Sequence, residues 1–169
     1  MRPLFAAIAA TATFVAVLSG AGVALAYERV PTRTPGLWES ATITNAGRTT
    51  VKECVDERTD RLVLQLVAVL TCKNTDFKRT EDGYAAGARC SAGGMTVDNK
   101  ITVTGDFDQW ARAEALTTMT STDDQSALNR TFSTAIETRR LGDCAEGQIP
   151  GDIVLPGGKT VHVNPSNKR

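Results

Sequence analysis

The stretch between Val97 and Phe107 alternates apolar and polar side chains more regularly than any other part of the chain. If the backbone is extended, one side carries the apolar side chains of Val97, Ile101, Val103 and Phe107. The other side carries the polar side chains of Asp98, Lys100 and Thr102. A period of two residues is typical of a strand that buries one face. We therefore predict a half-buried strand here.

Further strands are predicted where runs of β-branched and apolar residues end at turn-forming residues. The turn signals include Asn45-Ala46-Gly47, Glu81-Asp82-Gly83 and Gly93-Gly94, and such clusters mark turns between antiparallel strands. The predicted strands are 37–44, 48–54, 74–79, 84–91, 110–120 and 128–141, and a small hairpin is expected over 153–155 and 160–163.

Residues 56–70 have a different pattern, because Leu62 and Leu66 recur at helical spacing. Asp56 is a residue type that caps helices, so a helix is predicted over this range. β-branched side chains such as Val63 also suit a buried strand, which stays open as the alternative. Together the elements predict a mainly β (α+β) fold: a curved antiparallel β meander of about six or seven strands with one helix packed on it.

The first 26 residues have the pattern of an export signal. Arg2 precedes an apolar run from Leu4 to Val23, and Ala24-Leu25-Ala26 forms a small-x-small cleavage site. This order is that of a secretory signal peptide over residues 1–26. A retained membrane anchor is the alternative, because the apolar run is long enough to cross a bilayer.

The charged residues favour no class of partner. Basic and acidic residues balance at a formal net charge of zero, and removal of the leader takes away one arginine and no acidic residue. Net charge alone therefore selects neither nucleic acid nor a membrane surface. The remaining length suits a single β-rich domain over 27–163, and the polar residues 164–169 are expected to form a disordered tail.

All four cysteines follow the predicted leader: Cys54, Cys72, Cys90 and Cys144. An even count in an exported chain indicates two disulfides. Of the three pairings, we favour Cys54 with Cys72 and Cys90 with Cys144, because neighbouring segments of a meander meet most easily. Zinc is the rival interpretation, but zinc ligands come in closely spaced pairs that this chain lacks, so neither a metal nor a cofactor is predicted.

Four pieces of the sequence stand in a familiar order: Thr34–Glu39, Cys54 after a short strand, Cys72 followed by Lys73, and Arg140–Cys144. With Cys90 between them and Pro150-Gly151-Asp152 behind them, the chain resembles the family called domain of unknown function 3617, from Pro35 to about Asp152. The resemblance implies an exported, disulfide-bonded, β-rich protein of the Gram-negative periplasm. It implies no known reaction and therefore no catalytic residue.

Few groups in the sequence suit catalysis. His162 is the only histidine and lies between two valines near the end of the chain, so we expect it to be structural or exposed rather than the base of a hydrolytic triad. Asp106 and Asp108 flank Phe107, a spacing that puts both acids on one face of a strand, where they could act as acid and base or bind calcium. A solvated strand end is the simpler interpretation, and Asp123-Asp124 has the composition of a turn.

Two tryptophans are candidate ligand-lining residues. Trp38 and Trp110 could line a pocket in a curved sheet, although the core is the commoner place for such side chains. Arg139-Arg140 is the only pair of adjacent arginines. Because no basic stripe accompanies it, nucleic-acid binding is not predicted.

We therefore predict a protein that is not an enzyme: a non-catalytic binding module for a small apolar ligand or an envelope component, located in the periplasm, with secretion as the alternative location. A periplasmic protein–protein adaptor that uses an exposed edge strand is the second hypothesis. A hydrolase that uses Asp106 and Asp108 is the third. No stable membrane span is expected after signal cleavage.

Overall fold

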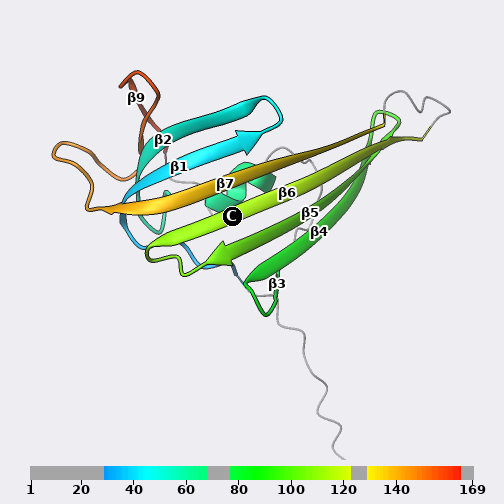
Figure 1. Cartoon of the computed structure of the whole chain (residues 1–169), viewed down its shortest axis with the longest axis horizontal. Helices are drawn as coiled ribbons and strands as arrows, with labels where there is room; N and C mark the ends of the chain where they lie inside the picture. The colour runs from blue at the N-terminus through cyan, green and yellow to red at the C-terminus, as the bar shows by residue number, and fades with distance from the viewer. Residues whose placement is uncertain (1–28, 68–76, 123–128, 165–169) are drawn as a thin grey trace, which may run out of the picture.

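A computed structural model describes residues 29–67, 77–122 and 129–164. These residues form nine strands and one helix (Figure 1). The elements are, in chain order, β1 (Gly36–Thr44), β2 (Gly47–Val55), α1 (Leu62–Val67), β3 (Lys78–Arg79), β4 (Tyr84–Ala92), β5 (Met95–Gly105), β6 (Trp110–Ser121), β7 (Arg130–Gly142), β8 (Asp152–Val154) and β9 (Thr160–His162). The predicted leader, Asp123-Asp124 and residues 165–169 of the predicted tail lie outside the described ranges.

The strands form one open antiparallel sheet in the order β3-β4-β5-β6-β7-β1-β2-β8-β9. From β3 to β7 each strand pairs with its neighbour in the chain, as in the predicted meander. The β1–β2 hairpin then lies beside β7 (Figure 1), so the first long strand pairs with the last long one. The prediction of a simple meander of six or seven strands is wrong in this respect. The β1–β7 pairing joins segments far apart in the sequence, and strands as short as β3, β8 and β9 extend the sheet.

Local turn signals place the hairpins correctly. β1 pairs with β2 up to Thr44 and Gly47, and β4 pairs with β5 up to Ala92 and Met95, so each connection has two residues. In the second turn Gly93 and Gly94 have φ angles of 57° and 74°. Glycine adopts such angles without strain, and a positive φ at both central residues is typical of a type I′ hairpin turn.

The helix is shorter than predicted and begins at Leu62 rather than at Asp56. Asp56 closes a turn instead of capping a helix, because its carboxylate accepts hydrogen bonds from the backbone N–H groups two and three residues later, at 2.9 and 2.8 Å. Leu62 and Leu66 are buried, as their spacing predicts. The strand alternative is therefore wrong for α1, and residues 68–70 of the predicted helix lie outside the described ranges.

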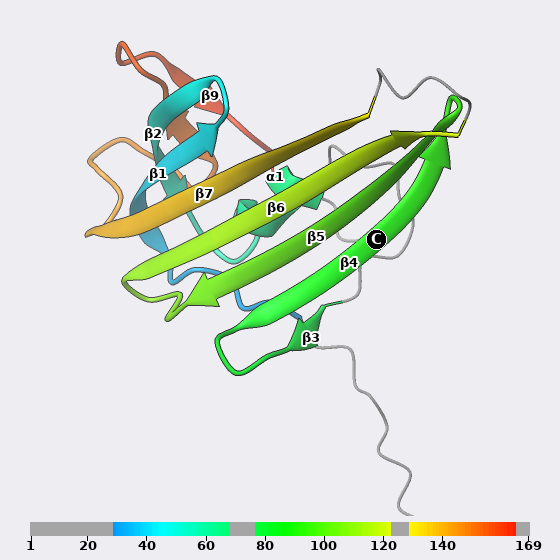
Figure 2. The same cartoon turned by 45° about the vertical axis from the view of Figure 1, so that its right-hand side comes forward.

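α1 covers one face of the sheet, which we call the inner face (Figure 2); the opposite face is the outer face. The core lies between the helix and the inner face of β4 to β7, and it contains Leu62, Leu66, Tyr84, Ile101, Val103, Phe107, Ala111, Ala113, Ala115 and Ile136. On β5, Ile101 and Val103 are buried while Lys100 is exposed, which confirms the predicted alternation. Phe107 is buried too, but it lies beyond the strand, in the β5–β6 turn.

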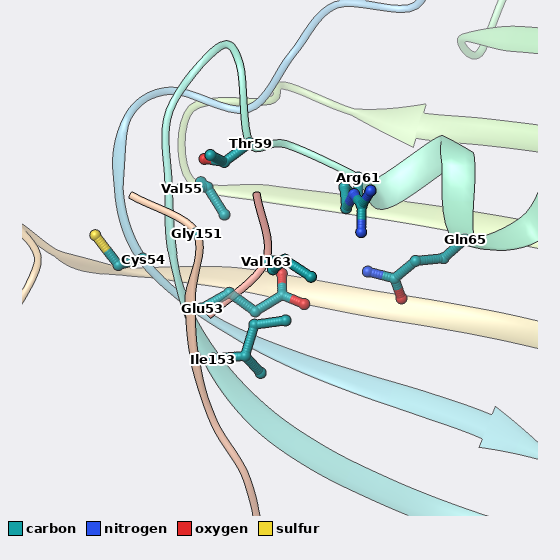
Figure 3. Close-up of a pocket in the computed structure, with 9 residues that line it drawn as sticks. All are labelled: Glu53, Cys54, Val55, Thr59, Arg61, Gln65, Gly151, Ile153 and Val163. Carbon is teal, nitrogen blue, oxygen red and sulfur yellow. The ribbon is translucent and has the colours of Figure 1, made fainter. Parts of the chain in front are cut away.

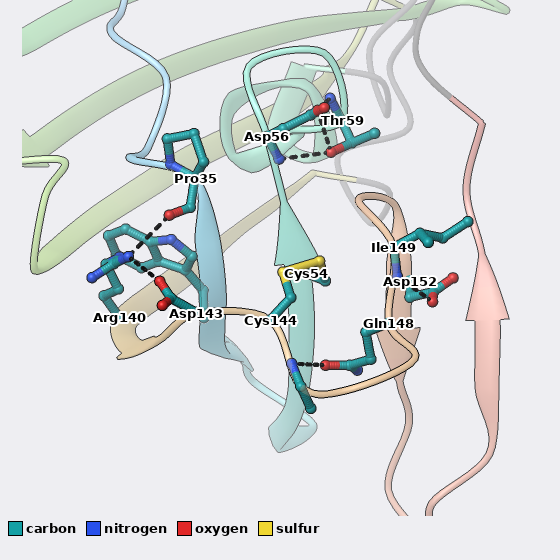
Figure 4. The surroundings of a disulfide bond; sticks show 12 residues. Pro35, Cys54, Asp56, Thr59, Arg140, Asp143, Cys144, Gln148, Ile149 and Asp152 are labelled. Atoms are coloured by element: carbon teal, nitrogen blue, oxygen red, sulfur yellow. Dashed lines mark hydrogen bonds and ion pairs between the residues drawn. A yellow bond between two sulfur atoms is a disulfide. The ribbon is translucent and has the colours of Figure 1, made fainter.

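A disulfide joins Cys54 to Cys144 (Figure 4). The predicted pairing of Cys54 with Cys72 and of Cys90 with Cys144 is therefore wrong. The reason is the strand order, because Leu37 on β1 pairs with Cys54 on one side and with Gly142 on the other, which brings the ends of β2 and β7 together. Cys90 is also disulfide-bonded, and Cys72 lies outside the described ranges.

The segment around Cys144 is held by its own hydrogen bonds (Figure 4). Arg140 Nη2 donates to the Pro35 carbonyl at 3.1 Å and to Asp143 Oδ1 at 3.3 Å. The backbone N–H of Ala145 donates to Gln148 Oε1 at 3.0 Å. This segment then leads into β8, which pairs with β2. In the part of the chain that the structure describes, no helix has the length and apolar character needed to span a membrane.

Candidate functional site

The two candidate tryptophans lie on opposite faces of the sheet. Trp38 pairs with Arg140 of β7, and Trp110 pairs with Arg139 of the same strand. Because successive residues of a strand point to opposite faces, the two indoles do as well. Trp38 is fully buried on the inner face, whereas Trp110 on the outer face is 48% exposed. They do not line a common site.

A buried arginine that the sequence did not single out lies over Trp38. Arg33 is 1% exposed, and its guanidinium carbon lies 5.4 Å from the centre of the Trp38 ring. Its Nη1 donates to Ser40 Oγ and Thr138 Oγ1, at 3.1 and 2.9 Å. Its Nη2 donates to Glu53 Oε2 at 2.9 Å. These contacts join the segment before β1 to β1, β2 and β7.

Asp60 completes the surroundings of Arg33. Arg33 Nε and Nη2 both donate to Asp60 Oδ1, at 3.1 and 2.9 Å, and the backbone N–H of Arg33 donates to Asp60 Oδ2 at 2.6 Å. A guanidinium has five N–H donors, and here all five have an acceptor. We call Arg33, Ser40, Glu53, Asp60 and Thr138 the Arg33 cluster. Because it is saturated, it is a structural centre rather than a binding site.

No local pattern marked Arg33, because it belongs to no strand or helix and its role depends on side chains from distant elements. The only sequence signal was its place just before the Thr34–Glu39 motif. Buried arginines are rare unless they are paired, so the burial itself could not be predicted from a polar residue in a loop.

A small cleft (Figure 3) shares Glu53 with the Arg33 cluster. It is lined by Glu53, Cys54, Val55, Thr59, Arg61, Gln65, Gly151, Ile153 and Val163. Its enclosed volume is about 10 Å³, roughly the space for one water molecule, and it opens to solvent. Arg61 Nε is buried and has no hydrogen-bond partner among the residues that the structure describes.

Farther along the inner face, Asn99 of β5 lies opposite Thr117 of β6. Asn99 is 2% exposed, and its Oδ1 accepts a hydrogen bond from Thr117 Oγ1 at 3.2 Å. Within the described part of the chain, the amide nitrogen Nδ2 has no hydrogen-bond partner. Buried polar groups are nearly always hydrogen-bonded in proteins, so an orphaned amide requires an explanation.

Apolar side chains surround this amide on the same face. Thr117 pairs with Phe132 of β7, and one step along the sheet Val97 of β5 pairs with Met119 of β6. Residues paired across strands share a face, and all three apolar side chains are half-buried. We call Val97, Asn99, Thr117, Met119 and Phe132 the Asn99 patch. A few polar groups, here Asn99 and Thr117, within an otherwise apolar surface are typical of small-ligand sites.

The two acids around Phe107 have structural roles. The prediction that Asp106 and Asp108 share one face of a strand is wrong, because both lie in the β5–β6 turn. Asp106 Oδ1 accepts the backbone N–H groups of Asp108, Gln109 and Trp110, at 2.9, 2.7 and 3.0 Å. These bonds, those from Trp110 and Gln109 above all, hold the pKa of Asp106 below its usual value. They stabilise a turn in which Phe107 has a φ of 60°.

His162 is anchored by a cross-strand pair. It lies opposite Asp152 in the β8–β9 hairpin, with its Nδ1 at 2.9 Å from Asp152 Oδ1. The pKa of Asp152 is lowered by the backbone N–H of Ile149 and by this imidazole. His162 therefore holds the hairpin together. Among the described residues, no group of three or more histidine, cysteine or acidic side chains is arranged to hold a metal ion.

Arg139 and Arg140 point to opposite faces, so they do not form one basic patch. Arg139 is on the outer face, 3.8 Å from Glu39. Other charges on that face are paired as well: Arg112 contacts Glu137 and Glu114, and Arg48 contacts Glu137. This arrangement of alternating charges is that of a solvated sheet surface.

Comparison with known proteins places the chain in a family. No curated protein and no solved structure matches it. The model of the family described as "Protein of unknown function (DUF3617)" matches residues 33–144. This range begins at the buried Arg33 and ends at Cys144 of the disulfide, and it covers more than half of the sequence. The chain therefore belongs to the DUF3617 family of proteins of unknown function.

Proposed function

We propose that this protein is a non-catalytic binding module of the periplasm that holds a small, largely apolar ligand at the Asn99 patch. The observation that carries this proposal is the orphaned Asn99 Nδ2, a hydrogen-bond donor enclosed by an otherwise apolar part of the inner face. A ligand with an apolar body and one acceptor oxygen would satisfy it.

The energetic argument concerns the cost of a buried donor without an acceptor. Leaving such a group unpaired costs about 1–3 kcal/mol, a substantial fraction of the stability of a small domain. An aliphatic residue at position 99 would extend the apolar surface of Ile101 and Val103 without this cost. A ligand acceptor explains why an amide stands there instead.

The location is supported by the covalent chemistry. Disulfides such as Cys54–Cys144 persist in oxidising compartments and are rare in the cytoplasm. The predicted leader over residues 1–26 would export the protein from the cytoplasm. The periplasm is an oxidising compartment outside the cytoplasm, so it agrees with both the disulfide and the leader.

Native mass spectrometry of protein purified from its own envelope tests the proposal. We expect a bound small molecule that is released into organic solvent and depleted in an Asn99→Leu variant. Lys100→Ala is the matched control, because Lys100 is the exposed neighbour on the outer face; its ligand content should equal that of the wild type. In parallel, the neutral probe N-phenyl-1-naphthylamine should fluoresce with the extracted wild type and be displaced by the extract. Protein that carries no small molecule and does not bind the probe would contradict the proposal.

A protein–protein adaptor is the second candidate, favoured by the edge of β2. β8 pairs with β2 only at Lys52 and Glu53, so within the described ranges residues 47–51 pair with β1 alone. Unpaired backbone groups of an edge can accept a strand from a partner. A stoichiometric protein in the same mass spectra, lost when proline replaces Thr49, would favour this candidate over the ligand-binding one.

A further inference from the structure

The cleft lined by Arg61 has a chemistry of its own, separate from the Asn99 patch. Arg61 Nε is buried without a hydrogen-bond partner, and no hydrogen bond or ion pair of its side chain occurs within the described ranges. Arg33, in the adjacent cluster, has an acceptor for each of its five donors. A guanidinium partly withdrawn from water and lacking an acceptor is an unsatisfied cation.

A second donor accompanies Arg61. Gln65 lies four residues later, so it shares a side of α1 with Arg61. Figure 3 shows the two side chains converging on the same opening, toward Val163 and Ile153 on the far wall. The opening thus has polar donors on the helix side and apolar side chains on the opposite side.

The charge around the cleft limits which anion fits. Among the described residues that line it, Arg61 and Glu53 carry a charge. Glu53 is held by Arg33, which also binds Asp60, so this buried group of one cation and two carboxylates carries one net negative charge. Among the described residues that line the cleft, Arg61 supplies one positive charge without a partner, and a monoanion balances it.

The donors and the apolar side chains of the cleft favour a carboxylate. The enclosed part of the cleft has about the volume of one water molecule and opens to solvent, so one oxygen of an anion fits inside it while the rest of the ligand lies along the open side. A planar carboxylate can accept two N–H donors of a guanidinium side by side. The apolar side chains of Val55, Ile153 and Val163 line the same cleft, so they can contact an aliphatic group attached to the carboxylate.

We propose that this cleft is a binding site for an aliphatic monocarboxylate. Arg61 donates to the carboxylate through Nε and an Nη, Gln65 donates to the same group, and the aliphatic chain lies against Ile153 and Val163. The site differs in position and in ligand chemistry from the Asn99 patch, so it does not depend on the proposed function above.

Titration with sodium hexanoate, followed in 1H–15N NMR spectra of the disulfide-intact protein, tests this site. We expect saturable shifts of the Arg61 Nε–H signal and of the Gly151 and Val163 amides. Arg61→Gln should weaken binding at least about tenfold, because a charge-assisted pair is lost. Arg58→Gln is the matched control, since Arg58 is exposed in the neighbouring turn, and it should leave the affinity unchanged.

Two further probes separate a carboxylate site from other outcomes. Methyl hexanoate, which lacks the charge, should cause no saturable shift of the Arg61 signal, and neither should inorganic phosphate. The proposal is overturned if hexanoate causes no saturable shift, if Arg61→Gln binds it as tightly as the wild type, or if phosphate shifts Arg61 to the same extent. None of these readouts depends on the neutral fluorescent probe used for the Asn99 patch, so either proposal can fail alone.

Discussion

Arg33 and Asp60 hold each other through three hydrogen bonds, two from the guanidinium and one from the backbone N–H of Arg33. The residues are 27 positions apart, and their side chains are 1% and 5% exposed. This pair fastens the segment before β1 to the turn before α1. With Glu53 it forms a buried ionic centre whose parts depend on one another, since loss of the cation leaves two carboxylates without a partner.

Replacement of Arg33 by methionine is expected to destabilise the protein by about 3–5 kcal/mol, because Glu53 and Asp60 stay buried without their cation. Urea unfolding with the disulfides intact measures the loss. The exposed Arg58→Met serves as control and should change the unfolding free energy by less than about 0.5 kcal/mol. Equal stability of the two variants would show that the Arg33 cluster contributes nothing.

Peptide mapping under non-reducing conditions should recover Cys54 joined to Cys144. Since Cys90 is also disulfide-bonded, the remaining cysteine, Cys72, is its expected partner in the map. A peptide that joins Cys90 to Cys144 would contradict the structure.

Loss of the Cys54–Cys144 bridge should be costly, because it spans 90 residues. The double variant Cys54→Ser/Cys144→Ser is expected to lose about 4 kcal/mol of stability, chiefly because the unfolded chain regains freedom. Thermal and urea unfolding of the oxidised proteins measure the difference. A double variant as stable as the wild type would mean that the strand pairing alone fixes this end of the sheet.

Asp106→Ala should lower the urea midpoint, because three backbone N–H groups of the β5–β6 turn lose their acceptor. Asp108→Ala is the matched control two residues away; its carboxylate accepts hydrogen bonds from the side chains of Gln109 and Thr34 rather than from backbone groups of the turn. We expect Asp108→Ala to lower the urea midpoint less than Asp106→Ala does. The order of the two midpoints decides whether Asp106 organises this turn.

The stability of the protein should fall in acid. Asp106 and Asp152 have pKa values lowered in the folded state, chiefly by backbone N–H groups. A lowered pKa means that the stabilisation is present above the unfolded value, near 3.8, and is lost as the pH falls through the folded value. Urea midpoints measured from pH 7 down to pH 2 should therefore drop below about pH 4. In Asp106→Asn this drop should be shallower, and an unchanged slope would exclude Asp106 as a contributor.

The periodic parts of the sequence predicted the periodic parts of the fold. Alternation around Ile101 and Val103 identified β5 and its buried face, and the turn signal Asn45-Ala46-Gly47 located the first hairpin, in which Gly47 already belongs to β2. These features depend on residues that are neighbours in the chain, so the local pattern contains the necessary information.

The residues of the candidate site could not be predicted from local sequence patterns. Trp38 and Trp110 were identified by residue type, but the register of β7 sends them to opposite faces. Asn99 and Arg61 were not singled out, because an amide on a strand and an arginine near a helix are ordinary surface residues until their surroundings are known. Their missing hydrogen-bond partners are visible only in three dimensions.

By itself, the sequence determined that the chain folds mainly into antiparallel strands, where most of those strands run, and that Leu62 and Leu66 face the core. Only the tertiary structure decided that β1 lies between β7 and β2, that Arg33 is buried, and that Cys54 bonds to Cys144. The physical reason is how far apart in the sequence the interacting residues lie. Strand periodicity and turns depend on adjacent residues, whereas these three outcomes depend on which strand edges meet when distant segments pack together.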